Sequence, residues 1–158
     1  MFMPKLFTQV FLPEFSKLFG EGNKRQIFQI FNHTNSLMLA ISAIICLSVF
    51  FFAEYILSAF GTDFTNAAII LQIMLPSVFI RMISIPFVSF LSGTQYVLYP
   101  NIGGIIILLV STLCWVMLVP DYQLKGIAIG YTSGIIVGIG YQIITAIFKI
   151  KSFSEEDK

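Results

Sequence analysis

The chain has 158 residues, of which 57% are hydrophobic and 11% are charged. Soluble domains have roughly 45–50% apolar and about 25% charged residues, so this composition excludes a water-covered globular domain. The net charge of +1 also argues against nucleic acid as a partner, because no basic excess is present to hold a phosphate backbone. The composition predicts an all-α integral membrane protein whose first partner is the lipid bilayer.

Two apolar stretches in the first half of the chain are long enough to cross a bilayer, which takes about 20 helical residues. The first is 36–57, in which the one charged residue, Glu54, lies near the end. The second is 67–91, which contains one charge, Arg81. Each stretch is expected to form a transmembrane helix.

The second half of the chain carries no formal charge between Arg81 and Asp121. As one helix this run would be roughly 58 Å long, which exceeds a hydrocarbon core of about 30 Å. Residues 92–101 contain the Gly, Pro, Asn and Tyr typical of an interfacial turn. Further spans are therefore expected over 102–119 and 126–148, so the predicted fold has four transmembrane helices in two hairpins.

The basic residues predict the orientation of these spans. Seven Lys and Arg lie in the flanking segments 1–35 and 149–158, whereas the membrane region 36–148 has one basic residue in a connection, Lys125. Positive residues concentrate on the cytoplasmic side of a membrane. We therefore expect a cytoplasmic or interfacial segment at 1–35 and a cytoplasmic tail at 149–158, in a multi-pass protein of a bacterial inner membrane with both termini in the cytoplasm.

No group of residues points to catalysis. His33 is the one histidine, and nothing near it in sequence completes a metal site or a catalytic triad. Cys46 and Cys114 each lie in a predicted span, where a thiol behaves as a small apolar group. The chain is therefore expected not to be an enzyme and to have no catalytic residue, metal or cofactor.

Glycine recurs at intervals of four residues in the last predicted span, at Gly126, Gly130, Gly134 and Gly138. This spacing removes side chains from one stripe of a helix, so a neighbouring backbone can approach closely. The glycine stripe, as we call these four residues, is expected to face the protein interior, either as static helix packing or as a surface along which helices slide.

Arg81 is the second unusual feature, because it lies roughly 15 Å from either end of its span at helical rise. A central arginine costs about 2.5–3.5 kcal/mol on insertion scales, so it is normally paired or faces water. Ser77 and Ser84 fall on about the same helix face. We expect either a cavity-facing residue that meets an anionic ligand or a structural pair with a partner outside this chain.

The chain contains the segments FLPEFSKLFGEGN, RMISIPFVSFLSGTQYVLYPN and LVPDYQLKGIAIGYTSG. These three segments resemble the polysaccharide flippases of the multidrug/oligosaccharidyl-lipid/polysaccharide exporter superfamily. The second segment is similar to the family's span and turn with an Arg, a Pro and a Gln, which adds Gln95 to Arg81, Ser77 and Ser84 as candidates for substrate binding. In the third, Gln123 and Leu124 stand where the family pattern usually has a glycine.

The resemblance implies the C-terminal part of a two-lobed helical transporter that moves undecaprenyl-pyrophosphate-linked oligosaccharides across the cytoplasmic membrane for O-antigen or capsule synthesis. The first lobe and the start of the second would then be supplied by missing N-terminal helices or by a partner membrane subunit.

Two alternatives stay open. The chain could be a non-transporting four-helix membrane protein that packs with a polysaccharide polymerase or a glycosyltransferase. It could also be a fragment from the drug/cation antiporter branch of the same superfamily, which would be expected to place an acidic residue in the membrane.

Overall fold

The computed structural model describes Lys17 and residues 24–61 and 67–155, the side chains of 24–28 and 152–155 excepted. The expected all-helical fold is confirmed: this part of the chain forms three long helices, α2, α3 and α4, each apolar enough to cross a membrane. The segment expected at 1–35 lies largely outside the described residues. Its last part, from Lys24, is already helical.

Helix α2 spans Lys24–Ser58 and contains the first expected span. It ends where Phe60 N–H donates to Leu57 O (3.0 Å) and Gly61 N–H donates to Ser58 O (3.1 Å). Gly61 has φ 125°, a conformation that L side chains rarely adopt. Glycine at this position therefore lets the chain leave the helix sharply.

Helix α3 spans Ala68–Gly93 and contains two prolines, Pro76 and Pro86. It runs two residues beyond the expected end at 91, and α4 begins at Leu98, so the connection 94–97 is shorter than the predicted turn at 92–101. Tyr99 N–H donates to Tyr96 O (3.2 Å) and closes this connection as a tight turn.

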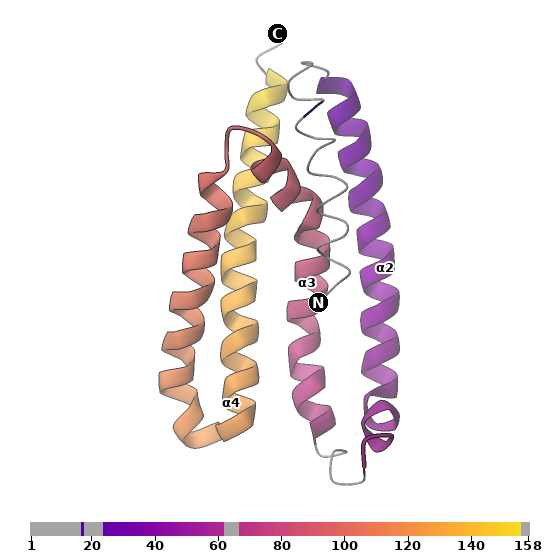
Figure 1. The fold of residues 1–158 in the computed structure, drawn as a ribbon, viewed down its shortest axis with the longest axis vertical. Coiled ribbons are helices and arrows are strands. Elements are labelled where there is room, and N and C mark those ends of the chain that lie inside the picture. The colour runs from indigo at the N-terminus through magenta and orange to yellow at the C-terminus, as the bar shows by residue number, and fades with distance from the viewer. Residues whose placement is uncertain (1–16, 18–23, 62–66, 156–158) are drawn as a thin grey trace.

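Helix α4 spans Leu98–Glu155 and contains both expected spans, 102–119 and 126–148, one on each side of a residue with non-helical backbone angles. The described residues thus form three long helical elements, and the last of them holds two of the four expected spans. The backbone breaks at Gln123, with φ 48° and ψ −123°. The chain folds back there into a first arm, 98–122, and a second arm, 124–155 (Figure 1). The helix also continues into the expected tail at 149–158, as far as Glu155.

Helix α3 lies in the middle of the bundle and packs against both α2 and α4 (Figure 1). The start of α2, the connection 94–97 and the end of α4 gather at one end, which we call the basic end because Lys149 and Lys151 are there. The end of α2, the start of α3 and the break in α4 lie at the opposite end.

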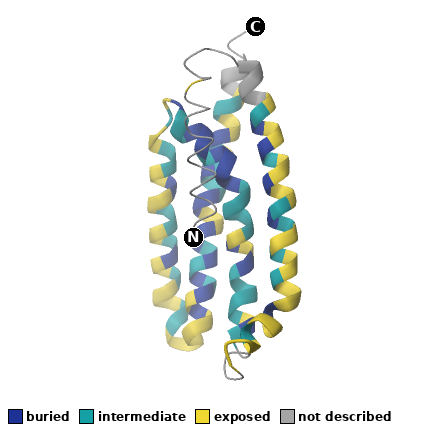
Figure 2. Cartoon of the chain, turned by 45° about the vertical axis from the view of Figure 1, so that its right-hand side comes forward, coloured by how far each residue is buried: buried dark blue, intermediate teal, exposed yellow. Residues whose placement is uncertain are grey.

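Exposed residues follow the outer helices from one end of the bundle to the other (Figure 2), and many of them are large apolar residues. Phe51 is 76% exposed and Val116 is 73% exposed. Water would oppose so much apolar exposure, whereas lipid or neighbouring membrane helices would cover it. This surface and the length of the three helices agree with a multi-pass membrane protein.

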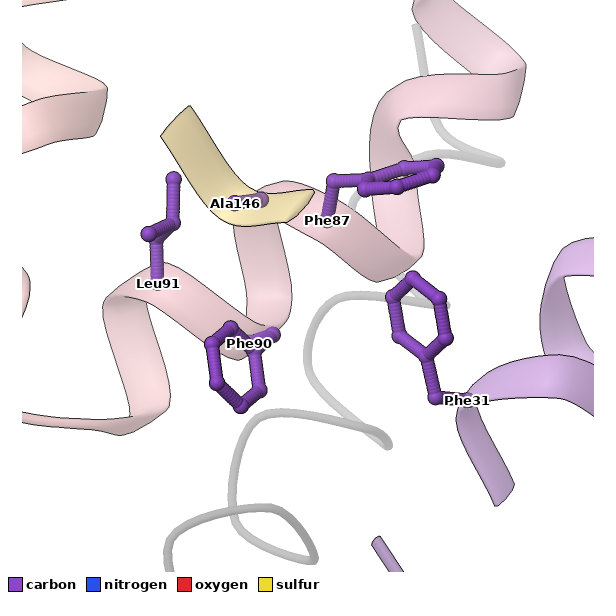
Figure 3. Packing of buried hydrophobic residues seen from close by; sticks show 5 residues of the cluster. All are labelled: Phe31, Phe87, Phe90, Leu91 and Ala146. Carbon is purple, nitrogen blue, oxygen red and sulfur yellow. The ribbon is translucent and has the colours of Figure 1, made fainter. Parts of the chain in front are cut away.

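The buried core lies towards the basic end, where all three helices contribute side chains (Figure 3). Phe31 of α2 meets Phe87 of α3 edge to face, with ring centroids 4.9 Å apart. Phe90 and Leu91 are almost fully buried beside Ala146 of the second arm. Aromatic pairs of this geometry add about 0.5–1.5 kcal/mol beyond the area they bury, so the Phe31–Phe87 contact helps to hold α2 against α3.

Candidate functional site

Arg81 lies at the middle of α3, the central helix, and is half-buried. Pro76 precedes it and Pro86 follows it in the same helix. A proline has no N–H to donate and its ring crowds the carbonyl four residues earlier, so the helical hydrogen bonding is interrupted on both sides of Arg81. Arg81 therefore lies between two interruptions in the backbone hydrogen bonding of α3.

The two serines predicted to share a face with Arg81 are buried, with exposed fractions of 2% for Ser77 and 4% for Ser84. Ser77 Oγ donates to Met74 O (2.6 Å), and Ser84 Oγ donates to Arg81 O (2.8 Å). Both hydroxyl protons are thus used within α3. In this conformation the two serines offer a ligand acceptor oxygens but no hydrogen-bond donor.

Gln95 lies in the connection at the basic end, where it is exposed and its Nε2 donates to the Tyr96 hydroxyl (3.3 Å). The helical distance from Arg81 to Gly93 is roughly 18 Å at 1.5 Å per residue. The structure therefore separates Gln95 from Arg81 along the bundle axis and does not bring the four candidate substrate-binding residues into one site.

The glycine stripe is buried and faces the first arm of α4. A Cβ atom added at Gly126 would lie 2.6 Å from the carbonyl oxygen of Leu118, and one at Gly138 would lie 2.7 Å from that of Gly103. Gly134 meets Ser111 in the same way. Successive glycines of the second arm thus meet successively earlier residues of the first arm. This is the pattern of two antiparallel helices in close contact.

Polar side chains at both ends of this contact were not singled out as candidates by the sequence analysis. Trp115 Nε1 donates to Ile127 O (3.0 Å) beside the break, and Gln142 Nε2 donates to Pro100 O (2.9 Å) near the basic end. Each links one arm to the other. The sequence does not reveal that these two side chains link the arms, because each donates to a backbone carbonyl, and every residue carries a backbone carbonyl.

Two of the hollows on the bundle surface are lined by residues that the structure describes. One, of about 440 Å³, lies between α2 and α3 and is lined by apolar groups that include Cys46, Phe50 and Pro76. The other, of about 420 Å³, lies at the break in α4 and is lined by residues that include Asp121, Gln123 and Lys125. Neither hollow contains any of the four candidate substrate-binding residues.

The histidine and the two cysteines, which are expected to have no catalytic role, lie apart from one another. His33 is exposed on α2, and Cys46 and Cys114 are half-buried free thiols on different helices. Among the residues that the structure describes, no three His, Cys, Asp or Glu side chains come together as metal ligands would. The described part of the chain therefore offers no metal centre to build a mechanism on.

Comparison with known families agrees with this architecture of apolar helices. The family model MatE matches residues 13–120, from the segment before α2 to the end of the first arm. No curated protein and no solved structure matches the chain. MatE proteins are membrane transporters and are generally not enzymes. Because the match covers more than half of the chain, the protein belongs to the MatE family of the multidrug/oligosaccharidyl-lipid/polysaccharide exporter superfamily.

Proposed function

We propose that this chain is the C-terminal part of a flippase that carries undecaprenyl-pyrophosphate-linked oligosaccharides across the bacterial inner membrane for O-antigen or capsule synthesis. Membership of a transporter family supports transport over a purely structural role beside a polymerase or glycosyltransferase. The observation that carries the proposal is the position of Arg81, half-buried at mid-height of the central helix. The resemblance of the 81–101 segment to flippases supports the choice of substrate.

Arg81 would act on the part of the substrate that is hardest to move, the pyrophosphate. A pyrophosphate in hydrocarbon loses its hydration, and a guanidinium can replace two of the lost hydrogen bonds in one planar, bidentate contact. The interruptions at Pro76 and Pro86 would let the turn that carries Arg81 shift without breaking the rest of α3. Binding would thus be coupled to movement of the central helix.

The remaining helices of the transporter would cover the exposed apolar faces of α2 and of the first arm. Such faces are expected where a helix meets either lipid or another lobe. In this arrangement the basic end faces the cytoplasm, the substrate enters from the inner leaflet, and both termini remain cytoplasmic.

An antiporter of the drug/cation branch would be expected to carry an acidic residue at the depth of the bilayer. The acidic side chains that the structure describes, Glu54 and Asp121, are exposed and lie near the end of α2 and beside the break in α4. Their positions favour the flippase for this chain.

The test replaces Arg81 in cells that make the whole transporter, with surface polysaccharide and membrane protein abundance measured together. Arg81→Ala should abolish or strongly reduce surface polysaccharide at normal abundance, and Arg81→Lys should restore part of it, because an ammonium keeps the charge but not the planar fork. Lys125→Ala removes a basic residue from the opposite end and should export normally.

Normal export by a well-expressed Arg81→Ala protein would overturn the proposal. Loss of abundance that Arg81→Lys restores in proportion to export would instead make Arg81 a structural residue. Loss of drug efflux with normal polysaccharide would move the protein to the antiporter branch.

A further inference from the structure

Lys149 and two tyrosines form a compact cluster at the basic end. The Lys149 ammonium lies over the rings of Tyr96 and Tyr99, 5.0 Å and 5.5 Å from their centroids. The two rings are 6.2 Å apart and tilted by 58°. An ammonium within about 6 Å of an aromatic face is attracted by the ring quadrupole, so the turn between α3 and α4 and the end of the second arm jointly hold this positive charge. We call these three residues the Lys–Tyr cluster.

The two tyrosine rings pack against the buried core. Both pack against the buried group that contains Phe90, Leu91 and Ala146. Tyr96 and Tyr99 are nevertheless half-buried rather than enclosed, and so is Lys149. The Lys–Tyr cluster is therefore supported by the core on one side and partly exposed on the other.

Hydrogen bonding within the cluster leaves donors available to a ligand. Gln95 Nε2 donates to the Tyr96 oxygen, which uses an acceptor position of that hydroxyl and leaves its proton free to be donated. An ammonium has three N–H donors, and an aromatic face is not a hydrogen-bond acceptor of oxygen strength. The cluster thus combines one charged donor with two tyrosines that each carry a hydroxyl donor, and this combination suits an oxyanion.

The depth of the cluster indicates where that oxyanion comes from. The apolar run of the second arm, 126–148, ends at Lys149, and the turn 94–97 lies at the same end of the bundle (Figure 1). Tyrosine and lysine at the end of an apolar helix are typical of the level of the lipid headgroups. A phosphate ester reaches this level on every phospholipid molecule, whose acyl chains would lie along the exposed apolar surface below.

We propose that Lys149, Tyr96 and Tyr99 bind the phosphate of an anionic phospholipid headgroup. The ammonium supplies the charge, and the two hydroxyls supply further donors. This site is separate from Arg81 and from the substrate proposed above, and it would retain a lipid at the junction between α3 and the second arm.

The test is native mass spectrometry of the full chain in a mild detergent, titrated with phosphatidylglycerol or phosphatidylcholine. Wild-type protein should retain phosphatidylglycerol in preference to phosphatidylcholine. Lys149→Gln should weaken phosphatidylglycerol binding about fivefold, the effect expected of one basic residue at an anionic lipid. Lys151→Gln removes an equal charge from an exposed position two residues further along the helix, and residues two apart do not share a helix face. This variant should therefore weaken binding less than Lys149→Gln does.

Two further variants separate lipid binding from a purely structural cation–π contact. Lys149→Arg keeps the charge over the rings and should retain phosphatidylglycerol. The double variant Tyr96→Phe, Tyr99→Phe keeps both rings but removes both hydroxyls, and it should bind the lipid several-fold more weakly while keeping its helical circular dichroism. This double variant also decides the question if Lys149→Gln aggregates.

Equal effects of Lys149→Gln and Lys151→Gln would overturn the proposal in favour of general charge attraction. Unchanged binding by the double phenylalanine variant would overturn it in favour of a structural contact. Displacement of the lipid by millimolar inorganic phosphate would overturn the assignment to a lipid and make free phosphate the ligand.

Discussion

Gly138 of the second arm lies directly against Gly103 of the first, so close that a Cβ atom on Gly138 would be 2.7 Å from the Gly103 carbonyl oxygen. The obstacle is backbone, which cannot rotate away as a flexible side chain can. Gly140, two residues later, has open space where its Cβ would be. The two glycines therefore make a matched pair for testing the contact between the arms.

Gly138→Ala should destabilise the protein by about 1–3 kcal/mol, the range for overpacking a tight contact. Gly140→Ala should be neutral or slightly stabilising, because alanine favours the helix over glycine. Thermal unfolding in detergent, followed by loss of the monodisperse peak in size-exclusion chromatography, measures both. Equal melting temperatures for the two variants would show that the arms are not in contact at Gly138.

Gln123→Gly should stabilise the break in α4. The backbone of Gln123, with φ 48° and ψ −123°, is close to the first central position of a type II′ turn, which favours glycine. A non-glycine residue held in such a region costs about 1–3 kcal/mol. The resemblance to the flippases also indicates a glycine in this part of the chain.

The control for this change is Gln123→Ala. Alanine also removes the glutamine side chain beyond Cβ, but it keeps the Cβ atom and hence the backbone strain. The melting temperature should rise for glycine and not for alanine. A rise of equal size in both would assign the gain to removal of the glutamine side chain.

Thr132→Val should weaken the packing of the second arm on α3, since Thr132 Oγ1 donates to Ile73 O (3.1 Å) and Thr132 is 7% exposed. Such side-chain hydrogen bonds between membrane helices are worth about 0.6 kcal/mol on average. Thr112→Val makes the same change at an exposed position of the first arm. Chemical denaturation in mixed micelles should separate the two variants, and a larger loss at Thr112 would contradict this contact.

The topology predicts that reporter fusions after Gly61 and Asp121 lie outside the cytoplasm, and that fusions after Gln95 and Lys151 lie within it. The reason is that basic residues flank the membrane region at one end of the bundle, whereas Lys125 is the one basic residue at the other. Paired phosphatase and fluorescent-protein fusions read the two sides. An external signal at Gln95 would mean that the chain between α3 and α4 does not turn back into the membrane.

The apolar pattern determined the class of the protein and the positions of its helices. A hydrocarbon layer demands long apolar runs whatever the helices pack against, so α2 and α3 contain the expected spans 36–57 and 67–91. The turn at 94–97 also followed from length, since a bilayer cannot hold the charge-free run between Arg81 and Asp121 as one straight helix. The reversal of α4 lies between Asp121 and Lys125, in the gap between the expected spans 102–119 and 126–148. The residue at which the chain reverses, Gln123, was decided by the local backbone, whose φ of 48° and ψ of −123° are not helical.

The tertiary structure alone decided which faces meet. In lipid, an apolar side chain gains little from leaving one apolar surface for another, so helix association depends on close packing and on individual hydrogen bonds. The four-residue spacing of the glycine stripe indicated a close contact, but its partners, Leu118, Ser111 and Gly103, depend on the reversal at Gln123. For the same reason the sequence placed Ser77 on the face of Arg81 without showing that its hydroxyl donates to its own helix.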